Sequence, residues 1–378
     1  MFILGGNTRN DCIMENTKLI MLEGLPGTGK STNSHFLSMQ LEHEGKIVKW
    51  IHEVARPHPV LFFNEASLTY KEYSSILKAH PQSERILNQI AIFRKETVGI
   101  DLLDLEWNYS NDIGMSAFKD LQEYDVWTFP LDKYEDVALE KWAFFTEKAL
   151  EKEDEVYILD SSIFQFQIFT YLLQNASNKK IEQFILKLIE IVKPLNPCLI
   201  YFHRENARDT IDFLEKLRGK QFMESIWERD KAKPYYNDKP KGMDGHKQFL
   251  MDYANIAKQL FDIADCRKTS IEITKQDWKT YEDEILSFLG VERKSYPNVL
   301  PSNGIFRNED LAQDIEVNGL LMKDPKGTER ILTPKSTCEF YVECLPVVLH
   351  FNGLDQIIIS GEQICDRWTT TGTQFVRI

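Results

Sequence analysis

A glycine-rich segment near the N-terminus has the residue types and spacing of a phosphate-binding loop. Residues 24–31 are Gly-Leu-Pro-Gly-Thr-Gly-Lys-Ser, which match the pattern G-x-x-x-x-G-K-[ST]. Glycines let successive N–H groups point at phosphate oxygens, and the N-terminus of a following helix adds its dipole. Lys30 is expected to reach the β- and γ-phosphates, and the Ser31 hydroxyl to ligate Mg²⁺. The predicted nucleotide-binding residues are Gly24, Gly27, Thr28, Gly29, Lys30, Ser31 and Thr32.

Apolar runs predict the elements that position this loop. Residues 18–23 indicate a buried strand before it, and helical spacing of apolar residues indicates a helix to about Glu44. Four further strands are predicted at 47–51, 156–159, 198–202 and 270–274, with helical patterns between them. Alternating strands and helices favour a parallel sheet covered on both faces.

Charged residues follow three of these strands, where open parallel sheets bind ligands. Asp160 is expected to hold Mg²⁺ or to accept a proton from an attacking hydroxyl, although it also suits a helix N-cap. Glu53 is a candidate base and, with Arg56, a candidate substrate-binding residue; a solvated ion pair explains these two residues equally well. Arg204 and Arg208 are candidates to neutralise charge during phosphoryl transfer, although a charged helix face also accounts for them.

Arg94, which we expect on a helix before the third strand, is a further candidate for substrate binding. The predicted catalytic residues are thus Lys30, Asp160, Glu53, Arg204 and Arg208. The predicted substrate residues are Glu53, Arg56 and Arg94, and the predicted Mg²⁺ ligands are Ser31 and Asp160.

The chain length of 378 residues favours two domains. We expect a flexible tail at residues 1–17 and a nucleotide-binding domain at 18–291, with a mostly helical insertion at about 60–150. Prolines and a glycine predict a linker at 292–304, and short strand patterns beyond it, such as Ile315–Met322, predict a small all-β domain at 305–378.

Composition excludes several classes of protein. The formal net charge of −13 argues against a general nucleic-acid binder, because phosphate backbones require clustered cations. The 6 cysteines form no C-x-x-C pair, and no apolar stretch has the length of a membrane helix. These features predict a cytoplasmic protein with no membrane contact.

The strand, the loop ending in Gly29-Lys30-Ser31-Thr32 and the helix resemble the Walker A region of the P-loop kinase superfamily. Within it, residues 18–290 look most like the nucleoside-monophosphate and thymidylate kinase-like group. Glu53, Arg56 and Asp160 stand at positions where that group has acidic and arginine residues, whereas Ser161 replaces its arginine. The resemblance implies an α/β fold of the P-loop NTPase kind, with three α/β/α layers and a five-stranded parallel sheet.

Together these features predict a Mg²⁺-dependent kinase that uses ATP or GTP. Its acceptor would be a nucleoside, a nucleotide or another hydroxylated small molecule. The alternative is an NTP-binding switch or sensor, a slow NTPase whose β domain binds a partner. The acceptor, the choice of nucleotide and the role of the β domain stay open, and a homodimer is a further possible arrangement.

Overall fold

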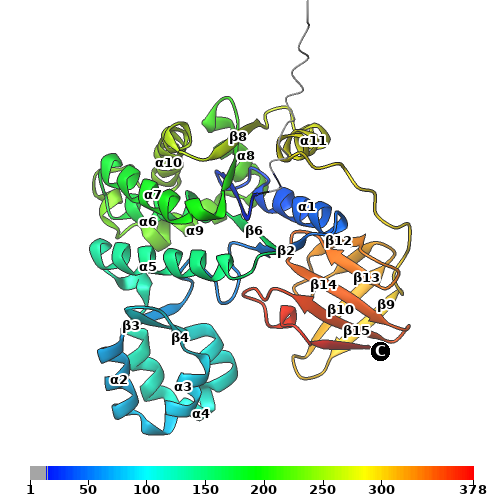
Figure 1. Cartoon of the computed structure of the whole chain (residues 1–378), viewed down its shortest axis with the longest axis horizontal. Helices are drawn as coiled ribbons and strands as arrows, with labels where there is room; N and C mark the ends of the chain where they lie inside the picture. The colour runs from blue at the N-terminus through cyan, green and yellow to red at the C-terminus, as the bar shows by residue number, and fades with distance from the viewer. Residues whose placement is uncertain (1–13, 15) are drawn as a thin grey trace, which may run out of the picture.

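Five parallel strands form the central sheet of the computed structural model, which describes Met14 and residues 16–378. Their order is β2-β6-β1-β7-β8, so β1 lies in the middle (Figure 1). This confirms the predicted five-stranded parallel sheet. The strands are β1 (Leu19–Gly24), β2 (Ile47–Ile51), β6 (Glu155–Asp160), β7 (Cys198–His203) and β8 (Arg267–Glu272).

Helices cover both faces of this sheet because the side chains of each strand alternate between two apolar cores. Leu19 and Met21 of β1 belong to one core, and Ile20 and Leu22 to the other. The first core packs against α5 (Leu131–Leu150), α6 (Gln165–Leu173), α7 (Asn178–Val192), α8 (Ala207–Arg218), α9 (Lys220–Asp230) and α10 (Met243–Ile263). The second packs against α1 (Lys30–His43) and α11 (Trp278–Leu289).

Part of the predicted N-terminal tail is packed. Met14 belongs to the second core and Thr17 is buried, whereas residues 1–13 and 15 lie outside the described residues. Within the part of the chain that the structure describes, no helix combines the length and the apolar character needed to cross a membrane.

An inserted lobe separates β2 from α5, and it contains strands that the expected helical insertion lacks. β3 (Glu65–Thr69), β5 (Thr97–Asp101) and β4 (Ile92–Phe93) form an antiparallel sheet in that order. It packs on α2 (Tyr70–Ala79), α3 (Glu84–Ile90) and α4 (Leu102–Gln122) around a core of its own. Figure 1 shows this lobe below α5.

Eight antiparallel strands close a barrel at the C-terminal end of the chain, where a small all-β domain was expected. They are β9 (Gly304–Asn308), β10 (Gln313–Asn318), β11 (Leu321–Lys323), β12 (Glu329–Pro334), β13 (Glu339–Val342), β14 (Val347–Asn352), β15 (Gln356–Gly361) and β16 (Gln374–Arg377). The predicted strand Ile315–Met322 is wrong as a single element, because Gly319 has a φ of 59° and turns the chain from β10 into β11. The first strand, β9, was not predicted; it closes the barrel against β16.

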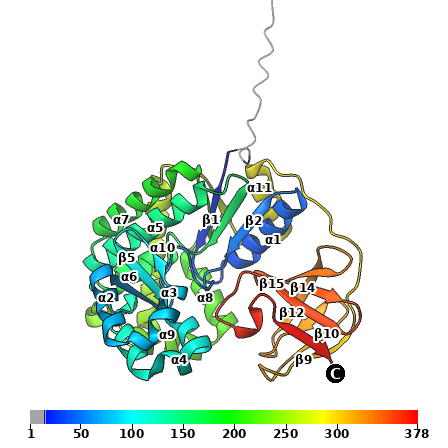
Figure 2. The same ribbon diagram turned by 60° about the horizontal axis from the view of Figure 1, so that its bottom comes forward.

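The barrel docks against the body beside α1 and β2 (Figure 2). On α1, Glu42 accepts a hydrogen bond of 2.8 Å from the Tyr341 hydroxyl, and the ammonium of Lys335 pairs with the same carboxylate. After β2, the Arg56 N–H donates to the carbonyl oxygen of Gln363 at 2.8 Å. The barrel therefore contacts both the helix that follows the glycine-rich loop and the segment that carries Arg56.

Candidate functional site

The glycine-rich loop joins the central strand β1 to the N-terminus of α1, and two of its glycines are sterically required. Gly24 has a φ of 152°, and a Cβ there would lie 2.5 Å from the carbonyl oxygen of Phe202 on β7. Gly29 has a φ of 84°, and its Cβ would lie 2.7 Å from the Trp278 ring. The Phe202 backbone excludes a larger residue at Gly24, whereas at Gly29 the positive φ disfavours one and the Trp278 ring would have to move.

Lys30 is buried at the first position of α1, and its ammonium donates to the carbonyl oxygen of Leu25 at 2.9 Å. The Thr28 hydroxyl donates to the same carbonyl at 2.7 Å. The amide of Asn33 donates to the Gly29 carbonyl at 2.8 Å. Side chains of the loop and of α1 thus hold the loop in a compact turn. The ammonium of Lys30 is largely removed from solvent within this turn.

Glu23, which is not among the predicted site residues, connects the loop to the segment after β6. Its fully buried carboxylate accepts the N–H groups of Ile163 at 2.6 Å and Gln165 at 3.1 Å. Burial raises the pKa of Glu23 to about 7, against the lowering effect of these hydrogen bonds and of Lys30. In the sequence, this role could have been inferred from the position of Glu23, a charged residue that directly follows the apolar run Leu19–Leu22.

Asp160 ends β6, directly beside β1, where it pairs in register with Leu22. The side chain is fully buried, and its Oδ1 accepts the Ser161 hydroxyl at 2.8 Å. Its Oδ2 has no hydrogen-bond partner within the described residues. The N-cap alternative is wrong: α6 begins at Gln165, the residue before it is Phe164, and no described side chain caps that helix.

A buried carboxylate oxygen without a partner fits a cation ligand, because such a group is unfavourable unless it is paired. Asp160 therefore fits the Mg²⁺ expected here, together with the half-buried Ser31 of α1.

Glu53 lies close to this site, after β2. Its Oε2 accepts a hydrogen bond of 3.1 Å from the side-chain amide of Gln165, whose backbone is held by Glu23. Glu53 is half-buried and follows β2, the strand next to β6, so it stands at the same C-terminal end of the strands as Asp160. The structure therefore brings these two candidate carboxylates to one end of the sheet.

The two arginines after β7 differ in their surroundings. The guanidinium of Arg204 is buried, lies 4.9 Å from the Phe213 ring centroid and donates to the Ile273 carbonyl at 3.5 Å. Arg208 lies in the first turn of α8 with an exposed side chain. Arg204 lines a cavity of about 820 Å³ that also reaches the glycine-rich loop at Leu25 and Thr28.

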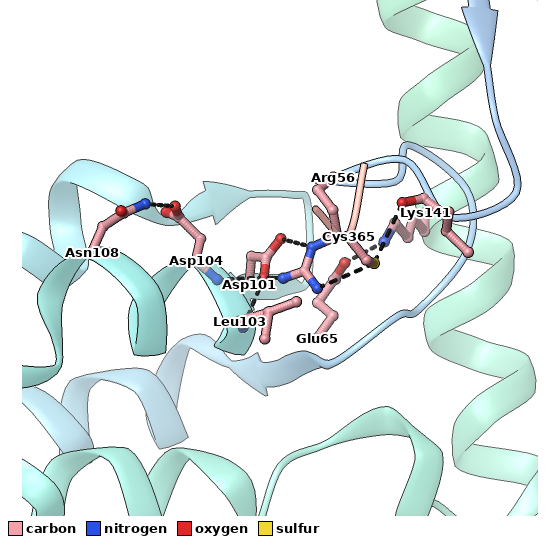
Figure 3. Close-up of polar contacts among 9 residues, drawn as sticks. Arg56, Glu65, Asp101, Leu103, Asp104, Asn108, Lys141 and Cys365 are labelled. Carbon is pink, nitrogen blue, oxygen red and sulfur yellow. Dashed lines mark hydrogen bonds and ion pairs between the residues drawn. The ribbon is translucent and has the colours of Figure 1, made fainter. Parts of the chain in front are cut away.

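Arg56 and Arg94 belong to a different cluster. Arg56 pairs with Asp101 through its Nε at 2.9 Å and contacts the thiol of Cys365 on the barrel (Figure 3). Its side chain is only 3% exposed, so the solvated ion-pair alternative is wrong for Arg56. Arg94 pairs with Glu65 at 2.5 Å, and it follows strand β4 and is not on the expected helix.

The barrel also touches the start of α1. Cys344, in the turn between β13 and β14, lies with its Sγ 3.5 Å from the Thr32 hydroxyl. Its backbone N–H donates to Nδ1 of His35 at 3.3 Å. Burial lowers the pKa of His35 to about 3, so this ring is neutral and Nδ1 is free to accept. Nothing in the local sequence indicated this contact, because its partners are 309 to 312 positions apart.

Comparisons with known proteins do not identify a family. No family model matches the chain, and no curated protein matches it. One solved structure that it resembles is a sulfotransferase domain from the curacin biosynthetic pathway, at 10% identity and a TM-score of 0.31, covering 74% of this chain and 75% of that chain. Similarity at this level identifies no shared activity.

The expected membership of the P-loop kinase superfamily, and of its nucleoside-monophosphate and thymidylate kinase-like group, is therefore wrong. No family model matches the chain, and the solved structure named above is a sulfotransferase domain and not a kinase. The glycine-rich pattern and the strand-helix alternation are local features, so they do not define membership of one family.

Proposed function

We propose that this chain binds a nucleoside triphosphate with Mg²⁺ and transfers the γ-phosphoryl group to a hydroxylated small molecule. Nucleosides and nucleotides are the first acceptors to consider. The observation that supports the proposal is the presence of two buried charged groups in the segments where the adjacent strands β1 and β6 end. Lys30 is a desolvated cation in the glycine-rich loop, and Asp160 is a fully buried carboxylate with an unpartnered oxygen.

The loop supports triphosphate binding through groups that are already positioned. Its backbone N–H groups and the N-terminus of α1 favour anions. The ammonium of Lys30 needs only to exchange the Leu25 carbonyl for a phosphate oxygen, because most of its desolvation has already occurred on folding. The cavity of about 820 Å³ beside Leu25 and Thr28 has the size typical of small-molecule sites and would take the nucleoside part.

Ser31 and Asp160 would hold Mg²⁺, which when bound neutralises charge on the triphosphate. With Asp160 in that role, Glu53 is left as the group that accepts the proton of the acceptor hydroxyl. Gln165 orients Glu53 by donating to its Oε2. The exposed Arg208 can move over the transferred group, whereas Arg204 is held by Phe213 and Ile273 and lines the nucleotide cavity.

A second candidate function is a nucleotide-dependent switch, and the docked barrel favours it. Cys344 of the barrel contacts Thr32, the residue after Ser31, so a rearrangement of the loop on nucleotide binding would reach the barrel directly. In this function the protein would hydrolyse the triphosphate slowly, and the barrel would bind a partner in one nucleotide state. An acceptor would then have no effect on turnover.

The test is release of ADP or GDP from the Mg²⁺ nucleotide, with and without pooled nucleosides, nucleotides and other hydroxylated compounds. Lys30→Ala should lower acceptor-dependent release about 100-fold or more, since it removes a charged donor to the reacting phosphates. Asp160→Asn should act in the same direction. Lys46→Ala, an exposed residue just beyond the far end of α1, is the matched control.

The outcomes separate the two functions. Release that rises with an acceptor pool and disappears in Lys30→Ala supports phosphoryl transfer. Nucleotide binding without any acceptor effect supports the switch. Equal turnover by the wild type and Lys30→Ala would contradict both functions, because both require Lys30 to contact the nucleotide phosphates.

A further inference from the structure

A second cavity lies where the body, the inserted lobe and the barrel meet. It has a volume of about 380 Å³ and is lined by residues from all three parts, including Arg94 of the lobe, Lys141 of α5 and Glu362 of the barrel. Within the described residues, it has no lining residue in common with the cavity beside the glycine-rich loop. It is therefore a separate candidate binding site.

Two residues that line this cavity, Arg94 and Lys141, belong to a buried group of three charges with Glu65. Glu65 accepts from Arg94 at 2.5 Å through Oε1, and its Oε2 pairs with the ammonium of Lys141 (Figure 3 shows Glu65 and Lys141). The three side chains are at most 6% exposed. Burial lowers the pKa of Lys141 to about 8, against the opposing effect of Glu65, so its ammonium is still charged at pH 7. Two cations thus share one carboxylate, which leaves one excess positive charge.

Lys141 also donates to the Leu61 carbonyl at 2.6 Å, whereas the guanidinium of Arg94 has donors left over. Nε and Nη1 of Arg94 have no hydrogen-bond partner among the described residues. Two neighbouring carboxylates have other partners: Asp101 pairs with Arg56 and accepts the first N–H groups of α4, and Glu155, on the cavity wall, accepts the Tyr157 hydroxyl at 2.5 Å. A buried cation with unpartnered donors is unfavourable, and an anion in the cavity would supply the missing acceptors.

The remaining walls of the cavity are partly apolar, so they favour an anion that also carries an apolar group. They are formed in part by Pro57, Pro59, Ile92, Phe144 and Phe145. At the exposed rim, Lys49 pairs with Glu362 and Lys148 with Glu151, so these cations are already neutralised.

We propose that this cavity binds a small organic anion, namely a carboxylate or a phosphate monoester that carries an aromatic or aliphatic group. Its charged group faces Arg94 and Lys141, and its apolar part lies against the prolines and phenylalanines. Because the walls come from three parts of the chain, the bound anion stabilises the docking of the lobe and the barrel on the body. The site is independent of the proposed phosphoryl transfer.

The test is calorimetric titration of the full chain at pH 7 with benzoate and phenyl phosphate, and with benzyl alcohol as the neutral probe. Both anions should bind at least about tenfold more tightly than the alcohol. Arg94→Met should weaken both anions by at least about tenfold. The matched control is Lys133→Ala, which removes an exposed cation of the same helix α5 outside the cavity.

A second variant covers the case in which Arg94→Met fails to fold. Ile92→Trp fills the cavity and leaves the three charges in place, so it should abolish binding of both anions with an unchanged circular dichroism spectrum. Phenyl phosphate should still bind to Lys30→Ala. Loss of binding in Lys30→Ala, with normal binding in Ile92→Trp, would place the ligand at the glycine-rich loop and overturn the proposal. So would failure of both anions to bind at millimolar concentrations.

Discussion

The buried histidine under the barrel predicts a defined loss of stability in acid. His35 lies on α1, stacked on the ring of Trp50 at 5.0 Å, and its Nδ1 accepts the backbone N–H of Cys344. Burial lowers its pKa to about 3, and the nearby His52 acts in the same direction. In the unfolded chain the same imidazole titrates near its model value of 6.5.

The sign and size of the effect follow from these two values. Between about pH 6.5 and pH 3 the unfolded chain binds a proton at His35 and the folded chain does not. Stability is therefore complete above the unfolded pKa and is lost as the pH falls, by about 1.4 kcal/mol per pH unit. From pH 7.5 to pH 5.5, His35 alone should remove about 1.4 kcal/mol from the free energy of unfolding.

The assay compares urea unfolding of the wild type and His35→Asn, followed by circular dichroism. Asparagine keeps an oxygen that can accept from Cys344 but does not titrate. The variant should be less stable at pH 7.5, because it leaves part of the ring volume empty. Its further loss on going to pH 5.5 should be smaller than that of the wild type by about 1.4 kcal/mol.

A comparison between pH 7.5 and pH 8.5 is the internal control, since His35 is neutral in both states there and the difference between the proteins should stay constant. Equal losses by both proteins between pH 7.5 and pH 5.5 would refute the reasoning, because His35 would then titrate alike in the folded and unfolded chains.

Three further substitutions test separate parts of the fold. Gly24→Ala should cost about 1–3 kcal/mol in urea unfolding and weaken nucleotide binding, because its Cβ meets the Phe202 carbonyl; unchanged stability would contradict the loop geometry. Thr69→Ala removes the capping box with Glu72 and should cost about 1 kcal/mol, seen as faster hydrogen exchange in α2 but not in α7. Trp368→Ala should destabilise the barrel by about 3–5 kcal/mol, since this residue is 1% exposed, and a near-ultraviolet melt that matches the wild type would argue against it.

Much of the secondary structure could be predicted because it depends on local patterns. The apolar run before Gly24 and the helical spacing after Lys30 indicated β1 and α1, and the alternation of strands and helices indicated the parallel sheet. The strands of the inserted lobe were harder to predict. The short strands β3 and β5 pair across about 30 residues, and most of the segment around them is helical. The barrel strand β9 was missed although it forms a local hairpin with β10, because it begins at Gly304, the last residue of the predicted linker, and its other pairing, with β16, joins distant parts of the chain.

Two features follow from local sequence patterns: the alternation of strands and helices that builds the sheet, and the glycine-rich turn that leads from β1 into α1. These features depend on the period of apolar side chains and on the conformational freedom of glycine, which act over a few residues. Which charged groups come into contact depends instead on the packing of distant segments. This packing joined Glu23 to the turn after Asp160 and separated Arg56 from the loop by pairing it with Asp101. Contacts of this kind depend on which buried charges the packed layers bring within hydrogen-bonding distance, and no local pattern encodes that choice.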